Sequence, residues 1–239
     1  MKRLLQYNIL IFIGILVTTI AKADEWFMPQ VSAYYSENNE YKLIVTPTFF
    51  PENYFRYLYK SDKRPKSKRI LRKIEELEQG ITPCVAELYK ESETGSVLIW
   101  KKPLLNDICP IHAIVANDGS SVATFDNWYS MGYGKNIFVV YDEKGEAKRS
   151  YKLEEISPFP LDDYMKSVVS LWWNNSGSFK SDSWIWNNLE TFRNRGTFPS
   201  YLANDCIFID NERIEIIFDS KENIQRRRIY NVKSLEFEE

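Results

Sequence analysis

Acid–base chemistry in this chain would have to be built on one histidine and on pairs of neighbouring carboxylates. His112 stands between Ile111 and Ala113 at the start of an apolar run. A serine hydrolase would need a nucleophile and an orienting acid around it, and the sequence contains no Gly-x-Ser-x-Gly turn. We therefore interpret His112 as a structural residue. A lone histidine also cannot make a histidine-rich metal site, so we predict no bound metal.

Adjacent carboxylates occur at Glu154-Glu155 and at Asp162-Asp163. Glycosidases use two carboxylates that face each other across a cleft, about 5 to 9.5 Å apart. Acidic neighbours in a loop or at a helix end are far more often solvated surface groups, and we interpret both pairs in that way. No glycine-rich phosphate loop follows any expected strand, so we predict no cofactor. Because His112 and the carboxylate pairs are interpreted as structural or surface groups, we also predict no catalytic residues.

The loop from Asp126 to Gly134 is the strongest candidate for ligand binding. It offers an acid, an amide, aromatic rings and two glycines. Aromatic side chains combine an apolar ring with a polar group, so such a loop could bind a sugar or a peptide. The residues that would do so are Asp126, Asn127, Trp128, Tyr129 and Tyr133. In the alternative, which we favour, Trp128 and Tyr133 fold back and cover the end of a sheet.

The three cysteines, Cys84, Cys109 and Cys206, match no zinc-binding spacing. In an oxidising compartment we expect one disulfide and one remaining thiol, and their spacing alone does not fix the pairing. Cys84 and Cys109 both precede expected strands in neighbouring units. We therefore predict a bond between these two.

The N-terminus has the three parts of a secretory signal peptide. Lys2 and Arg3 precede an apolar segment at 10–17, and Ala21-Lys22-Ala23 provides the small residues that signal peptidase requires. The alternative is a membrane anchor, for which the apolar segment is short. We predict a signal peptide at 1–23, export to the periplasm or the extracellular space, and no membrane span after cleavage.

Composition narrows the class of partner. The net charge is −2, and removal of the signal leaves 28 basic and 33 acidic residues, or about −5. General nucleic-acid binding depends on the neutralisation of phosphates, so we expect no nucleic-acid partner. With 7 Trp, 15 Tyr and 14 Phe the chain has the apolar bulk for a packed core. Residues 24–239 fit one β-rich domain.

Residues 110–153 predict four consecutive antiparallel strands. Two hairpins are expected, with turns at Asn117-Asp118-Gly119 and at Lys144-Gly145. Alternating apolar residues and many β-branched or aromatic side chains support each strand. The expected strands are 112–115, 121–125, 137–141 and 147–153.

A similar order of hairpins is expected on both sides of this unit. The first unit, 24–104, is interrupted by an insertion at 47–82 that contains a helix at Lys68–Gln79. The third unit, 165–239, is less regular, with a strand at 167–173, a segment at 183–189 that could be strand or helix, and a hairpin across 210–212. The sequence therefore predicts a mainly β fold of successive four-stranded antiparallel, blade-like sheets with one helical insertion.

Four-stranded units in series are the plan of β-propellers, which close with about four to eight blades. Two or three units are too few for a ring. We expect the sheets either to form a partial propeller or to stack face to face.

The segment Asn117–Gly134, together with Ile137–Asp142 and Gly145, resembles a group of uncharacterised exported bacterial proteins with WD40-like or β-propeller-like repeats. Their pattern is PDG…TFDNW…GYG…VVIYD..G, and this chain carries NDG, TFDNW, GYG and VVYD in the same order. Asn117 stands where these repeats usually have proline. The resemblance covers residues 110–175 and implies a repeat architecture and export, but no activity.

Three functions remain open. We expect an exported, non-enzymatic protein that binds an envelope protein, a peptide or a glycan. A hydrolase of envelope or extracellular polymers is the alternative, and it would need carboxylates that converge in a cleft. The third is an accessory protein whose sheet edge adds a strand to a partner.

Overall fold

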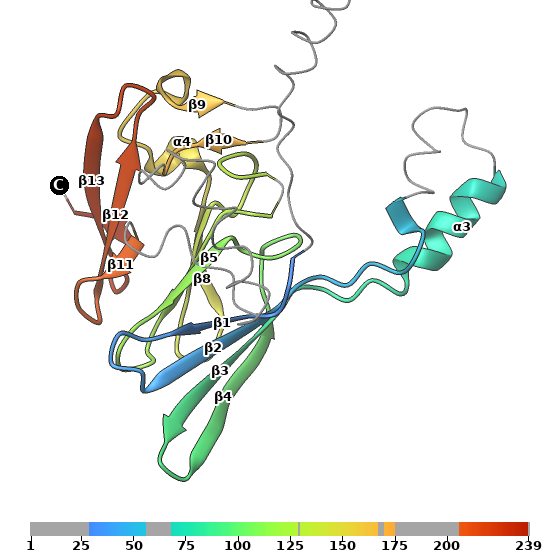
Figure 1. Ribbon diagram of the computed structural model, residues 1–239, viewed down its shortest axis with the longest axis horizontal. Helices are drawn as coiled ribbons and strands as arrows, with labels where there is room; N and C mark the ends of the chain where they lie inside the picture. The colour runs from blue at the N-terminus through green and yellow to red at the C-terminus, as the bar shows by residue number, and fades with distance from the viewer. Residues whose placement is uncertain (1–28, 56–67, 129, 167–169, 175–205, 239) are drawn as a thin grey trace, which may run out of the picture.

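The computed structural model describes residues 29–55, 68–128, 130–166, 170–174 and 206–238. These residues form three four-stranded antiparallel sheets, one two-stranded sheet and two α-helices (Figure 1). The predicted signal peptide and the segment 183–189 lie outside the described residues. Within the described ranges, no helix has both the length and the apolar character needed to cross a membrane.

The first sheet is the predicted unit that carries the insertion. β3 and β4 form a long hairpin that extends past β1 and β2 (Figure 1). β4 has a neighbour on one side only, so it is an edge of the sheet. In spatial order the strands are β1 (Ser32–Tyr35), β2 (Tyr41–Thr46), β3 (Val85–Ser92) and β4 (Gly95–Pro103).

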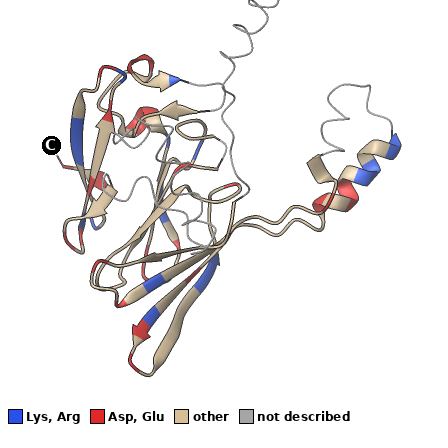
Figure 2. Ribbon diagram, viewed as in Figure 1, with Lys and Arg blue, Asp and Glu red and all other residues tan. Residues whose placement is uncertain are grey.

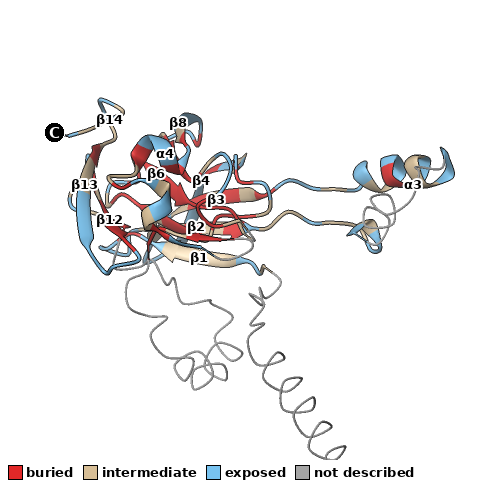
Figure 3. Cartoon of the chain, turned by 90° about the horizontal axis from the view of Figure 1, so that it is seen from above, coloured by how far each residue is buried: buried red, intermediate tan, exposed pale blue. Residues whose placement is uncertain are grey.

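The insertion contains the expected helix, α3 (Lys68–Glu78), which lies away from the sheets at the end of two extended connections. Its first turn has no acid and its last turn no base, which is opposite to what the helix dipole favours (Figure 2). The helix therefore depends on packing. Ile74 is its buried residue, and Figure 3 shows that most of the helix is otherwise exposed or half-buried. Before the helix, Tyr54 stacks on Phe50 at 5.6 Å between ring centres.

The second sheet has the four predicted strands in the predicted order. Its turns place Gly119 at φ 71° and Gly145 at φ 74°, a left-handed backbone that glycine adopts without strain. The strands are β5 (His112–Val115), β6 (Val122–Phe125), β7 (Phe138–Tyr141) and β8 (Ala147–Tyr151).

β7 shows why this sheet is the middle layer of the molecule. All four of its residues are buried, because side chains alternate between two separate cores. Val139 and Tyr141 belong to the core shared with the first sheet. Phe138 and Val140 belong to the core shared with the third sheet. A strand covered on both faces needs a continuous apolar run rather than alternation.

The third unit is a four-stranded sheet with short elements before it. Of the strand predicted at 167–173, the structure confirms Leu171–Trp172 (β10), which pairs antiparallel with Met165–Lys166 (β9), and residues 167–169 lie outside the described residues. Leu171 and Trp173 enter the core. The short elements are α4 (Leu153–Ile156), a 3-10 turn (Leu161–Asp163), β9 (Met165–Lys166) and β10 (Leu171–Trp172). The sheet consists of β11 (Cys206–Phe208), β12 (Arg213–Asp219), β13 (Gln225–Asn231) and β14 (Glu236–Phe237).

The prediction of a mainly β fold made of antiparallel four-stranded sheets is thus confirmed for the described residues. Two cores join the three larger sheets in series. The sheets do not close on themselves in this part of the chain, so the propeller-like form is not confirmed.

Candidate functional site

Asp126 opens the loop that the sequence selects for ligand binding, and the structure buries it completely. Its carboxylate accepts the N–H of Gly132 at 2.6 Å and the indole N–H of Trp173 at 2.8 Å. Burial raises the pKa of this carboxyl to about 7, and the two hydrogen bonds oppose that rise. Both carboxylate oxygens are engaged inside the protein. Asp126 therefore links the loop, through Gly132, to Trp173 of the segment 170–174.

Asn127 is also turned inward. Its amide donates to the carbonyl of Lys135 at 2.8 Å, and its oxygen accepts the N–H of Asp107 at 3.2 Å. Asn106, for which no sequence pattern indicates a role, is buried beside it and donates to the carbonyl of Asp126 at 2.7 Å. These amides tie the loop to the connection between the first and second sheets.

The aromatic residues of the loop are placed differently from one another. Trp128 is half-buried against the core between the first two sheets, and its backbone N–H donates to the carbonyl of Cys109 at 2.9 Å. Tyr133 reaches solvent, with 40% of its surface exposed. Tyr129 lies outside the described residues. Neither of the two cavities described below is lined by a residue of this loop. Ligand binding by the loop remains a prediction.

His112 is enclosed by aromatic rings. Its ring meets that of Tyr34 edge-on at 5.6 Å and lies parallel to that of Phe125 at 6.1 Å. Neither ring nitrogen has a hydrogen-bond partner within the part of the chain that the structure describes. Burial lowers the pKa of the imidazole to about 3, so the ring stays neutral and packs as an aromatic side chain against Tyr34 and Phe125.

The three cysteines are buried free thiols in the structure. Cys84 and Cys109 belong to the same core, between the first and second sheets. Burial raises the pKa of Cys84 to about 12 and that of Cys109 further still, to which the neighbouring Cys84 contributes. The two residues are therefore neighbours, and the disulfide between them remains a prediction.

The carboxylate pairs serve local structure. Glu155 accepts the N–H of Lys152 at 2.7 Å and so closes the first turn of α4. Asp162 forms an exposed ion pair with Lys166. The carboxyl with a strongly raised pKa in the described residues is Asp126, which is buried with both oxygens engaged.

Two cavities open on the surface. The larger, of about 550 Å³, lies between the turns of the second sheet and those of the third. Four of its charged groups form two pairs: Lys148 lies 3.9 Å from Asp142, and Lys233 pairs with Glu212. The smaller, of about 480 Å³, has two arginines in its wall. No group of three or more acidic, histidine or cysteine residues in the described part could hold a metal ion.

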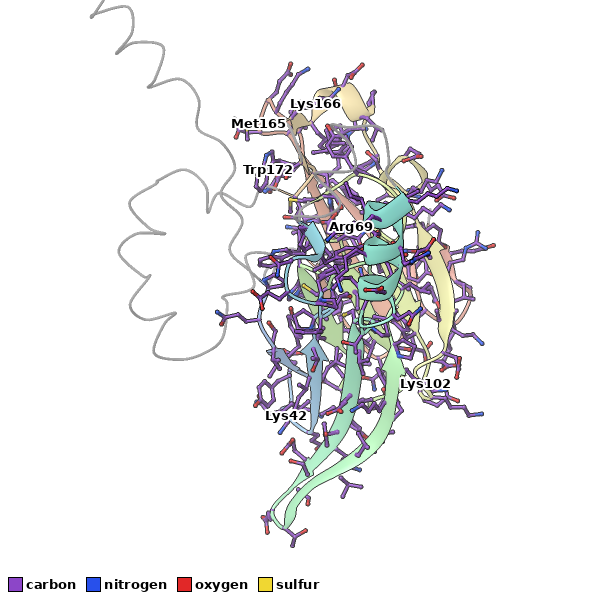
Figure 4. All side chains as sticks on the ribbon, turned by 90° about the vertical axis from the view of Figure 1, so that its right-hand side faces the viewer. Lys42, Arg69, Lys102, Met165, Lys166 and Trp172 are labelled. Atoms are coloured by element: carbon purple, nitrogen blue, oxygen red, sulfur yellow. The ribbon has the colours of Figure 1, made fainter. Side chains whose placement is uncertain are left out.

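The most unusual surface is the edge of β4. Val97, Leu98 and Ile99 follow one another there with 62, 48 and 45% of their surface exposed. Their hairpin extends past the other strands, with Lys102 nearer its base (Figure 4). The sequence predicts this strand, but it gives no sign that the strand lies at an edge, because that depends on which strands pair.

Comparisons of the chain with protein-family models, with curated proteins and with solved structures gave no match. The case for function therefore rests on the geometry of the chain itself.

Proposed function

We propose that this chain is an exported, non-enzymatic interaction protein that binds an extended segment of a partner protein at the edge of β4. The observation that carries the proposal is the run of three exposed apolar residues, Val97 to Ile99, on a nine-residue edge strand. Exposed, long, apolar edges invite pairing with another chain. In strand addition, main-chain hydrogen bonds supply affinity and alternate side chains supply selectivity.

The pairing of β4 with β3 explains how these side chains are presented. Trp100 lies opposite Leu88, but Leu98 lies opposite Tyr89, so Ile99 is the extra residue of a bulge. A bulge leaves its extra residue unpaired and re-aims the side chain. Because Val97 and Leu98 point to opposite faces, an added strand would meet apolar side chains on both.

The base of β4 is protected against pairing, which restricts the proposed site. Lys101 pairs with Glu87 at 2.6 Å, Lys102 pairs with Glu146, and Pro103 ends the strand. Lysines and proline are the residues that natural proteins use to block edges. The open half is therefore Gly95 to Ile99. It suits a partner segment with apolar side chains at alternate positions and no charge in its centre.

The opposite edge of the same sheet is not open in this way. β1 lies against β5 of the second sheet, and the hydroxyl of Tyr34 reaches the carbonyl of Ile111 at 3.5 Å. We therefore place the partner at β4 rather than at β1.

The proposal is tested by selecting peptides from a displayed library of random linear sequences and measuring their affinity by calorimetry. Selected peptides should be apolar at alternate positions. Leu98→Lys should weaken binding by at least about tenfold, since a charge would have to be desolvated at the contact. Ile224→Lys, a change at an exposed apolar residue outside β4, is the control. Equal affinities of the two variants would overturn the proposal.

A further inference from the structure

A second surface feature lies where the last strand of the second sheet meets the last strands of the third. The smaller cavity, of about 480 Å³, opens there. Arg149 from β8 and Arg228 from β13 line it, together with Ser234 and Glu236 near the C-terminal strand. None of these residues belongs to β4, so the site is independent of the function proposed above.

Each of the two arginines packs on an aromatic ring rather than pairing with a carboxylate. The guanidinium of Arg149 lies 5.2 Å from the centre of the Tyr151 ring, and that of Arg228 lies 4.0 Å from the centre of the Phe237 ring. Arg228 also donates to the carbonyl of Ile156 at 2.9 Å. Among the described residues, no ion pair includes either arginine. A guanidinium has five N–H donors, so both groups keep donors for a ligand.

The two arginines that precede Arg228 on β13 are placed differently from it. Arg226, Arg227 and Arg228 form a basic run on β13 (Figure 2). Arg227 points to the opposite face of the strand and lies 3.3 Å from Glu215. Arg226 donates to the carbonyl of Pro158 at 2.9 Å. Of the run, Arg228 is the residue that lines the cavity.

The rim of the cavity is held in an unfavourable backbone conformation. Leu235, which lines the cavity, has φ 61°, a left-handed value that leucine rarely adopts. Its carbonyl accepts the hydroxyl of Tyr151 at 2.9 Å, and its N–H donates to the carbonyl of Asn231 at 2.9 Å. Backbone strain of this kind costs about 1–3 kcal/mol and concentrates at ligand sites. The strained backbone of Leu235 and the two arginines therefore lie at the same cavity, and both support a ligand site there.

We propose that this cavity binds a carboxylate between Arg149 and Arg228. The planar fork of a guanidinium matches the two oxygens of a carboxylate, and the hydroxyl of Ser234 adds a donor in the same wall. Glu236 leaves the lining with one net positive charge, which suits a single carboxylate better than a more highly charged anion. A free organic acid and the C-terminal carboxylate of a peptide share this chemistry.

The test follows the side-chain N–H signals of the arginines by NMR during titration of the protein. The probes are acetate, an N-acetylated dipeptide with a free C-terminal carboxylate, the amidated form of that dipeptide, and inorganic phosphate. We expect saturable shifts at Arg149 and Arg228 with the carboxylates and none with the amide. Tighter binding of the dipeptide than of acetate would assign a peptide terminus, and equal binding would assign a free acid. No saturable shift, or equally tight binding of phosphate, would overturn the proposal.

Substitutions separate a built site from general attraction to positive charge. Arg149→Gln should weaken carboxylate binding by about tenfold, and Arg149→Lys should weaken it too, because the charge remains but the fork is lost. Arg227→Gln removes the same charge from the far face of β13 and should change the affinity by less than about twofold. Equal losses in Arg149→Gln and Arg227→Gln, or full binding by Arg149→Lys, would contradict a carboxylate site.

Discussion

Gly145, in the second turn of the middle sheet, lies against the indole of Trp100 from the first sheet. A Cβ at this position would meet Cδ2 of the indole at 2.7 Å. Gly119, in the first turn, is similarly placed against Tyr41, where a Cβ would meet the ring at 2.2 Å. Both glycines therefore serve two purposes: they close a hairpin and they let an aromatic ring of the neighbouring sheet approach the backbone.

Gly145→Ala should destabilise the protein by about 2 kcal/mol or more, because φ 74° strains alanine and the added methyl overlaps Trp100. Gly134→Ala is the matched control, since Gly134 has φ 88° but no atom within 4 Å of an added Cβ. The control should cost about 1 kcal/mol from backbone strain alone. Urea unfolding measures both, and equal losses would show that contact with Trp100 is unimportant.

His112→Phe should leave the protein equally stable or stabilise it by about 1 kcal/mol at pH 7, because it removes unpartnered buried nitrogens from an aromatic site. The folded pKa of about 3 lies below the ordinary 6.5, so the unfolded chain binds the proton more readily between these values. The imidazole therefore costs the protein stability as pH falls from 6.5 to 3. The free energy of unfolding, measured at pH 4.5 and 7.5, should favour the variant over the unchanged protein by more at pH 4.5. The same difference at both pH values would contradict this.

Asp126→Asn should show the opposite dependence on pH. The folded pKa of about 7 lies above the ordinary 3.8, so the folded protein holds the proton more tightly and loses stability as pH rises from 4 to 7. The amide offers one acceptor to the two donors of Gly132 and Trp173, so the variant should be less stable at pH 4. Its deficit should shrink toward pH 7.5 in urea unfolding. A deficit that is independent of pH would refute a titrating Asp126.

Cys84 and Cys109 should react little with iodoacetamide in the folded protein at pH 8. Both are buried, and burial raises the pKa of each thiol well above its usual value, so little reactive thiolate is present. Unfolding in urea should expose both to alkylation, as measured by mass spectrometry. If the exported protein instead resists alkylation in urea until it is reduced, the two cysteines form the disulfide that the sequence predicts.

The sequence predicts those elements whose structure depends on residues close to one another in the chain. The continuous apolar run of β7 and the glycine turns at Gly119 and Gly145 specify the middle sheet. The amphipathic pattern likewise predicts α3.

Interactions between distant segments were not predictable in this way. Asn106 acts by donating to a carbonyl 20 residues away, and nothing in its own surroundings shows this. Trp173 enters the core and donates its indole N–H to Asp126, a partner 47 residues away that local composition does not reveal. The edge position of Leu98 also depends on tertiary pairing. For that reason the sequence led to the loop at Asp126 rather than to β4.

Strand addition at β4 can be measured by amide hydrogen exchange with and without a selected peptide. We predict that outward-facing amides between Gly95 and Ile99 exchange more slowly when the peptide is bound, while those of β1 keep their rates. Slower exchange confined to the loop at 130–134 or to β14, with β4 unchanged, would contradict strand addition at this edge.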